Sequence, residues 1–189
     1  PMRVVSIALC ADQMLIALAD PAQIASLSYR ATDPTMSFYA AEAEAFPHAA
    51  RSAESVIQLR PDLVLVDSAT PAATRDLLLR LGFHLADVDP VATIDEAITQ
   101  IEALSDLLGR QARGEALAQL VASARFQAYD ANWGLTAAYV RRRGFVAGET
   151  ELVSDILRVI GLNNAGDVLV GREGGYLTLE QLVATPPDF

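Results

Sequence analysis

The residue types that most often carry chemistry are scarce in this chain of 189 residues, and they are scattered. Its two histidines, His48 and His84, lie far from each other and from the single cysteine, Cys10. No spacing among them matches a zinc or haem-attachment motif, so no metal site and no resident cofactor are predicted. His84 falls within a predicted strand, where a structural role is expected.

Motifs for catalysis are also missing from the sequence. It contains neither the nucleophile elbow of hydrolases nor the glycine loops that bind nucleotides. The segment 171–175 has the glycines of a phosphate loop but lacks its lysine. The sequence therefore favours binding over reaction, and no catalytic residue is predicted.

Polar and aromatic residues follow three of the predicted strands in the first half of the chain. These strands are expected at 3–9, 24–28 and 63–66. Open α/β sheets bind ligands at the carboxyl ends of their parallel strands, so the residues that follow are candidate ligand contacts. They are Cys10, Asp12, Gln13, Tyr29, Arg30 and Ser68.

Each of these candidates has a structural alternative. Asp12 could cap the helix expected at 11–19 instead of meeting a ligand. Tyr29 offers a stacking face and Arg30 could pair with a carboxylate or phosphate, but both could equally belong to an ordinary surface loop. The same holds for Ser68.

A second group of candidates lies near the end of a later predicted strand, 135–140. Arg141, Arg142 and Arg143 form the one basic run of the chain, and Phe145 follows closely. Positive charge there could meet an anionic ligand, with Arg143 and Phe145 as the named contacts; the alternative is a solvated surface run. Trp133, Tyr139 and Tyr176 could contact a large planar ligand, or could pack as ordinary aromatic residues.

Composition limits the partners of the chain. Its net charge is −10 and its pI is near 4.5, which argues against nucleic acid or an anionic membrane surface. Hydrophobic residues make up 52% of it, enough for a sizeable core, but no apolar run approaches the roughly 20 residues of a membrane helix. With one cysteine there is no internal disulfide.

The elements that must position these residues alternate between strand and helix, which predicts an α/β fold with a mostly parallel sheet. Ser52 should cap a helix over 53–59, and Pro61 should stop it and push Arg60 toward extended geometry. Thr70 and Pro71 predict the cap and first residue of the next helix. Strands are also expected over 83–88 and over 168–170.

A longer helical pattern divides the chain. Thr93 and Glu96 form a capping box ahead of an apolar stripe that runs through 94–126, interrupted at Gly109. We therefore expect an N-terminal α/β lobe at 1–92, a connecting backbone helix at 93–127 and a partial C-terminal α/β lobe at 128–189. Both lobes are expected to be Rossmann-like.

The last residues repeat a pattern of the first lobe, in which a helix is followed closely by Pro-Asp; we call this pattern the Pro-Asp device. A helix over 178–184, opened by a capping box of Thr178 and Gln181, precedes Pro186-Pro187-Asp188, as the helix over 53–59 precedes Arg60-Pro61-Asp62. A buried strand follows in the first case, whereas the chain stops at Phe189 in the second. The pattern predicts a second lobe truncated at its C-terminus.

Six segments in order carry a family resemblance. They are 3–18, Glu54 with Leu59-Arg-Pro-Asp-Leu-Val-Leu-Val66, Leu81-Gly82, Gly144-Phe-Val-Ala-Gly-Glu-Thr150, Gly161-Leu-Asn-Asn164 and Leu177-Thr-Leu-Glu-Gln-Leu182. Together they resemble the substrate-binding proteins of ABC importers of the helical-backbone class. Members of that class carry cobalamin, ferric siderophores or haem, and the resemblance covers nearly the whole chain.

The resemblance implies a mature periplasmic protein, its signal peptide removed, that clamps a bulky metal chelate or corrinoid between two lobes. It also implies that an exposed glutamate on each lobe docks onto an ABC permease dimer; the matching positions are Glu54 and Glu180. His48 matches a position where relatives can carry a ligand-lining aromatic residue. Without the resemblance, both glutamates would be first-turn residues favoured by the helix dipole.

Two rival functions remain open on the sequence alone. One is a cytoplasmic, doubly wound α/β enzyme with an unrecognised site. The other is a sensor or accessory domain that uses the same fold without a permease.

Overall fold

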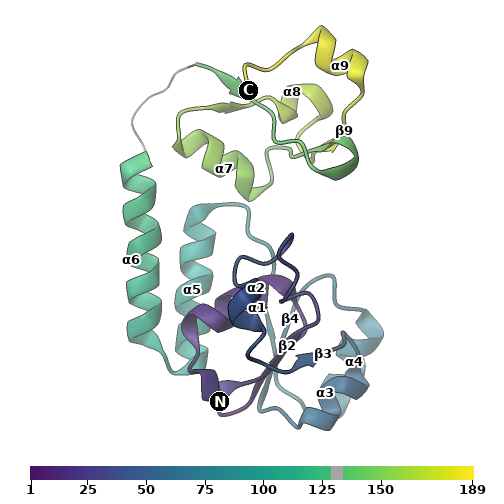
Figure 1. Cartoon of the computed structure of the whole chain (residues 1–189), viewed down its shortest axis with the longest axis vertical. Coiled ribbons are helices and arrows are strands. Elements are labelled where there is room, and N and C mark those ends of the chain that lie inside the picture. The colour runs from purple at the N-terminus through teal and green to yellow at the C-terminus, as the bar shows by residue number, and fades with distance from the viewer. Residues whose placement is uncertain (129–133) are drawn as a thin grey trace. The chain divides into compact units, whose positions relative to one another are not determined.

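The computed structural model describes residues 1–128 and 134–189, with side chains over 1–125 and 134–189 (Figure 1). The chain divides into two compact units. Unit 1 comprises Pro1–Pro90 and Gln100–Ala116, and unit 2 comprises Val91–Thr99 and Leu117–Phe189. The predicted α/β fold class is confirmed.

Unit 1 is built on a five-stranded, wholly parallel sheet with strand order β3-β2-β1-β4-β5. The order reverses direction between β1 and β4, as in a doubly wound fold. The strands are β1 (Val4–Ser6), β2 (Ile24–Ser28), β3 (His48–Ala49), β4 (Leu63–Val66) and β5 (Leu85–Asp87).

The central strands are buried on both faces, as their continuous apolar sequences require. Every residue of β1 and β4 is buried. One face packs against the helices α3 (Ala53–Leu59) and α4 (Ala72–Arg80), with Val56 and Leu78 fully buried in the cluster. The other helices of this part are α1 (Leu9–Leu18), the 3₁₀ turn η1 (Pro21–Gln23) and α2 (Ala40–Ala43).

Two local predictions in unit 1 are wrong. Arg60 is not extended but left-handed, at φ 47° and ψ 57°, because it ends α3 and its N–H bonds to the Ile57 carbonyl. Thr70 does not cap α4: Pro71 occupies the cap position, and the Thr70 hydroxyl donates instead to Asp67 at 2.9 Å. Ser52 does cap α3, accepting from the Ser55 N–H.

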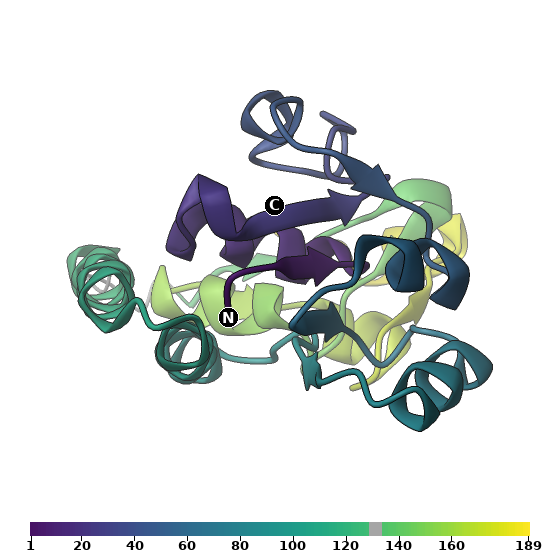
Figure 2. The same cartoon turned by 90° about the horizontal axis from the view of Figure 1, so that it is seen from below.

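The helical stretch over 94–126 is two helices rather than one. α5 (Ile94–Leu108) ends at Gly109, whose φ is +69°, and α6 (Gln111–Ala128) returns alongside it (Figures 1 and 2). The close approach depends on Gly114, where an added Cβ would lie 2.0 Å from the Ser105 hydroxyl. Thr93 caps α5 as predicted, but Glu96 bonds to the Ala92 N–H instead of that of Thr93.

Unit 2 has shorter elements. β6 (Thr136–Ala137) pairs in parallel with β8 (Asn163–Asn164), and β7 (Phe145–Val146) pairs antiparallel with β9 (Gly175–Tyr176). Its further elements are η2 (Arg142–Gly144), α7 (Leu152–Val159), α8 (Gly166–Val170) and α9 (Leu179–Ala184). The strand expected over 168–170 is therefore wrong, since these residues form the second half of α8.

The Pro-Asp device works in the same way in both units. In unit 1 the Asp62 carboxylate accepts from the N–H groups of Met2 and Arg3, and the Asp62 N–H bonds back to the Arg3 carbonyl. In unit 2 the Asp188 carboxylate accepts from the N–H and hydroxyl of Thr136, and the Asp188 N–H bonds back to the Thr136 carbonyl. Each aspartate thus fixes the start of the first strand of its unit.

Candidate functional site

The carboxyl edge of the sheet in unit 1 is held together by Arg51, a residue that sequence reasoning missed. Its guanidinium donates to the Ile7 carbonyl at 3.0 Å, to the Asp67 carboxylate at 2.8 Å and to the Ala69 carbonyl at 3.3 Å. These contacts join the loops that follow β1 and β4. No local signal marks Arg51, because its partners are 16 residues or more away in the chain.

Asp12 belongs to this framework rather than to an open surface. Its side chain is fully buried and accepts from the N–H of Ser28 at 3.0 Å and from its hydroxyl at 2.6 Å. Burial raises the pKa of the Asp12 carboxyl, and the hydrogen bonds from Ser28 oppose that rise. Asp12 neither caps α1 with its side chain nor reaches the surface, so we assign it to joining α1 to the end of β2.

Gln13 is likewise occupied by the protein itself. Its amide nitrogen donates to the Ser37 hydroxyl at 2.8 Å, and its amide oxygen accepts from the N–H groups of Phe38 and Tyr39. These bonds fix the loop after β2, on which the Phe38 ring is 87% exposed. The structure thus gives the predicted contact Gln13 a positioning role, and adds Phe38 as an exposed aromatic residue that the sequence did not single out.

The remaining candidates of unit 1 are exposed. Tyr29 and Arg30 stack on each other, with the guanidinium 5.5 Å from the ring centroid and a hydrogen bond of 3.0 Å to the phenol oxygen. Cys10, His48 and Ser68 also reach the surface.

Partial burial raises the pKa of the Cys10 thiol, as does the negative charge of Asp67, Asp12 and Asp89. This thiol therefore stays protonated and is a poor nucleophile.

Glu54 and Glu180 occupy the same position in their two helices. Each is the second residue after a cap that accepts a hydrogen bond, Ser52 for α3 and Thr178 for α9. Both glutamates are exposed, and neither side chain has an ion-pair or hydrogen-bond partner among the described residues. The capping box predicted for Thr178 and Gln181 is confirmed.

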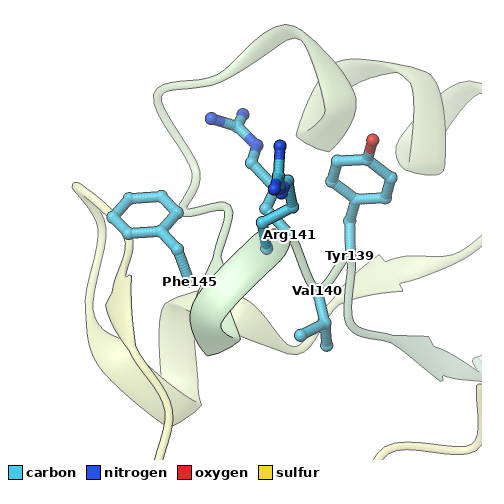
Figure 3. Close-up of a pocket in the computed structure, with 5 residues that line it drawn as sticks. Tyr139, Val140, Arg141 and Phe145 are labelled. Carbon is cyan, nitrogen blue, oxygen red and sulfur yellow. The ribbon is translucent and has the colours of Figure 1, made fainter. Parts of the chain in front are cut away.

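Unit 2 contains an open pocket of about 650 Å³ in the loop between β6 and β7. It is lined by Tyr139, Val140, Arg141, Arg142 and Phe145. Figure 3 shows Arg141 between the Tyr139 and Phe145 rings; its guanidinium carbon is 5.9 Å from the first ring centroid and 5.6 Å from the second. The sequence predicted Phe145 in this group but left Tyr139 undecided and did not single out Arg142.

The other candidates of unit 2 lie beside this pocket or outside the described residues. Tyr176 is exposed and meets the Phe145 ring edge-on, with centroids 5.5 Å apart. Arg143 is exposed at the tip of the loop, with a left-handed φ of 65°. Trp133 falls outside the described residues.

Over the described part of the chain, no group of three or more histidine, cysteine or acidic side chains is placed to hold a metal ion. Nor does any helix there combine the length and apolar character needed to cross a membrane.

Comparison with solved structures gives close matches in fold. The periplasmic heme-binding protein RhuT from Roseiflexus sp. RS-1 is 25% identical with a TM-score of 0.76, over 98% of this chain and 74% of that one. The periplasmic vitamin B12-binding protein BtuF of Vibrio cholerae is 22% identical with a TM-score of 0.75, over the same shares. The periplasmic heme-binding protein HutB of Vibrio cholerae is 18% identical with a TM-score of 0.81, over 100% of this chain and 74% of that one.

These similarities show that the chain has the fold of these periplasmic binding proteins. The sequence model described as periplasmic binding protein matches residues 4–189, so the chain belongs to that family. The family consists of substrate-binding transport proteins and indicates a periplasmic location. No curated protein matches the chain.

Proposed function

We propose that this protein is the substrate-binding component of an ABC importer. It captures an iron complex, either haem or a ferric siderophore, or a cobalamin, and delivers it to the permease. The observation that carries this proposal is the family match over residues 4–189. Heme- and vitamin B12-binding proteins with the same fold support the ligand class.

Ligand contact is assigned to residues of each unit that are exposed or, for Phe145, half-buried. In unit 1 these are Cys10, Tyr29, Arg30, His48 and Ser68, at or near the carboxyl edge of the sheet. In unit 2 they are Arg143, Phe145 and Tyr176. Aromatic rings suit a large conjugated ligand, and arginines suit its acidic groups.

Docking onto the permease dimer is assigned to Glu54 and Glu180. Support comes from their equivalence: each is exposed and has no partner among the described residues, and each helix is followed by the same Pro-Asp device. A partner made of two related subunits can receive two equivalent acidic residues with two equivalent basic surfaces. Such exposed charges contribute to encounter and orientation more than to the stability of the chain itself.

Titration of the purified protein with haemin, cyanocobalamin and a ferric siderophore tests the ligand class. Each ligand absorbs visible light, so binding is followed by its absorption spectrum and by calorimetry. Saturable 1:1 binding of one of them is expected. Failure of all three to bind would contradict the proposed function.

Charge reversal tests the docking role. In the full-length gene product, Glu54→Lys combined with Glu180→Lys should abolish ligand uptake by cells, because both acidic contacts with the permease become repulsive. Ligand affinity in solution should be unchanged. The matched control is Glu115→Lys on α6, another exposed glutamate without a partner among the described residues. Normal uptake by the double variant would refute the docking role.

A further inference from the structure

The loop after β2, residues 29–39, exposes large side chains although its backbone is firmly held. Phe38 is 87% exposed, Tyr29 56% and Met36 51%. A single exposed apolar residue is ordinary on a protein surface, but several on one short loop mark a surface that meets another molecule. The loop is therefore a candidate contact surface of unit 1.

A turn built on Asp33 fixes the middle of this loop. The Asp33 carboxylate accepts from the Thr35 N–H at 2.9 Å and from the Thr35 hydroxyl at 2.7 Å. The Asp33 carbonyl accepts from the N–H groups of Met36 at 3.0 Å and of Ser37 at 2.8 Å. Because an aspartate that bonds to the backbone two residues on stabilises a turn, the exposure of Met36 and Phe38 is not the result of a loose chain.

Gln13 fixes the part of the loop that carries Phe38. Its half-buried amide donates to the buried Ser37 hydroxyl at 2.8 Å and accepts from the N–H groups of Phe38 at 3.0 Å and Tyr39 at 3.2 Å. The Tyr39 ring meets the Phe38 ring edge-on, with centroids 5.0 Å apart. An exposed ring on a backbone held in this way loses little conformational freedom when it binds.

The loop starts at the edge of the sheet where the candidate ligand contacts of unit 1 lie. β1 and β2 are parallel neighbours, so the start of α1, which carries Gln13, and the loop after β2 share the carboxyl edge. Open α/β sheets bind ligands at that edge. Phe38 thus adds an apolar ring to the polar candidates of the same edge.

From these observations, and resting on the proposed function, we infer that the Phe38 ring contacts the imported ligand and that Gln13 is the positioning residue for this contact. Gln13 touches no ligand itself, because both ends of its amide are bonded to residues 37–39. It acts by holding the backbone from which the ring projects. The loop therefore contributes to affinity through preorganisation as well as through contact area.

Truncation of the ring tests the contact. The probe is whichever of haemin, cyanocobalamin and the ferric siderophore ferrichrome the wild type binds. Phe38→Ala should weaken binding of that probe about tenfold, because a phenylalanine ring that the ligand would cover is lost. The urea midpoint should not change, since the ring is exposed in the free protein. The control Leu120→Ala, which removes a side chain of α6 that is 66% exposed, should change neither quantity.

A double-mutant cycle separates positioning from general stability. Gln13→Ala should weaken binding of the same probe about fivefold in the wild-type background and not at all in the Phe38→Ala background, because its effect acts through the ring. The fall in urea midpoint caused by Gln13→Ala should be the same in both backgrounds. Gln13→Glu keeps an acceptor for the N–H groups of Phe38 and Tyr39, so it should restore the affinity of the wild type.

The outcomes separate this inference from the proposed function. Wild-type affinity in Phe38→Ala would overturn the contact, and a Gln13→Ala effect of equal size in both backgrounds would overturn the positioning role. Either result is obtained with a probe that the wild type binds, so the proposed function would stand. Failure of the wild type to bind any of the three probes would overturn both.

Discussion

At the scale of single residues, the buried carboxylate of Asp12 illustrates how an apparent contact residue serves the fold. It lies at the carboxyl edge, where ligands of such sheets bind, yet both of its oxygens accept from Ser28. Its neighbour Gln13 is similar, with both ends of its amide bonded to the 37–39 loop. Residue type and position along the chain could not distinguish these two from exposed Tyr29 and Arg30.

Replacing Asp12 measures its structural role. Asp12→Ala leaves the buried N–H and hydroxyl of Ser28 without an acceptor and should lower the free energy of unfolding by about 2 kcal/mol. Asp12→Asn keeps an acceptor for the Ser28 N–H and should cost less. Urea denaturation monitored by circular dichroism gives both values. If Asp12→Ala were as stable as the wild type, the assignment of Asp12 to the framework would be wrong.

The raised pKa of Asp12 also sets the sign of a pH effect. Its ordinary value is 3.8, and the folded protein holds the proton at a higher pH than the unfolded chain does. Between these two pKa values the folded state binds more protons, so the Asp12 contribution to stability rises as the pH falls. The stability difference between wild type and Asp12→Asn should therefore move in favour of the wild type as the pH falls toward 3.8. The opposite trend would contradict the raised pKa.

At the scale of elements, the sequence predicted which helices and strands are present better than it predicted where each begins and ends. The β2 strand matches its predicted residues, and α3 with its Ser52 cap and β4 with its apolar run were also predicted correctly, because local sequence suffices for each. The strands expected over 3–9 and 135–140 are shorter, since pairing partners limit them. The sequence predicts helix over 94–126 with an interruption at Gly109, but it does not show that the chain reverses direction there, because the reversal depends on packing between α5 and α6.

The contact between α5 and α6 provides a test at this scale. Gly114→Ala would improve helix propensity in an isolated helix by about 1 kcal/mol. Here the new methyl group would collide with Ser105, whose own Cβ is 2.4 Å from the added atom, so we expect a net loss of about 1–3 kcal/mol. Thermal and urea denaturation give the change.

A second substitution checks the cause. Ser105→Gly removes the colliding atoms, so adding Gly114→Ala to that variant should be neutral or stabilising. A penalty of equal size in both backgrounds would show that crowding between α5 and α6 is not responsible.

At the scale of the whole molecule, both units contain the Pro-Asp device, but they differ in the size of their sheets and in the number of large apolar side chains that they bury. Unit 1 has five paired strands, with β1 and β4 buried throughout. In the described part of unit 2, each strand has two residues and each sheet two strands, and the buried apolar side chains are mostly alanine and valine. Two-stranded sheets are marginal without extensive packing.

Native-state hydrogen exchange should reflect this difference. Amides of β1 and β4 should exchange only through global opening of unit 1, whereas those of β6 to β9 should exchange earlier, through opening of unit 2. Mass spectrometry of peptic fragments measures both. Equal protection in the two units would contradict the prediction.

The sequence by itself determined the α/β class, the Ser52 and Thr178 helix caps, the buried central strands and the repeated Pro-Asp device. Each of these depends on residues that are close together in the chain, where backbone preferences and apolar spacing act directly. Tertiary structure alone decided which polar side chains are bonded within the protein and which remain available to contact a ligand. Asp12 meets Ser28 from 16 residues away, Gln13 meets Phe38 from 25, and Arg51 meets Ile7 from 44. Burial and hydrogen bonding across such separations depend on packing, so only the folded chain shows which polar side chains are already bonded within the protein, as Arg141 is to Glu151.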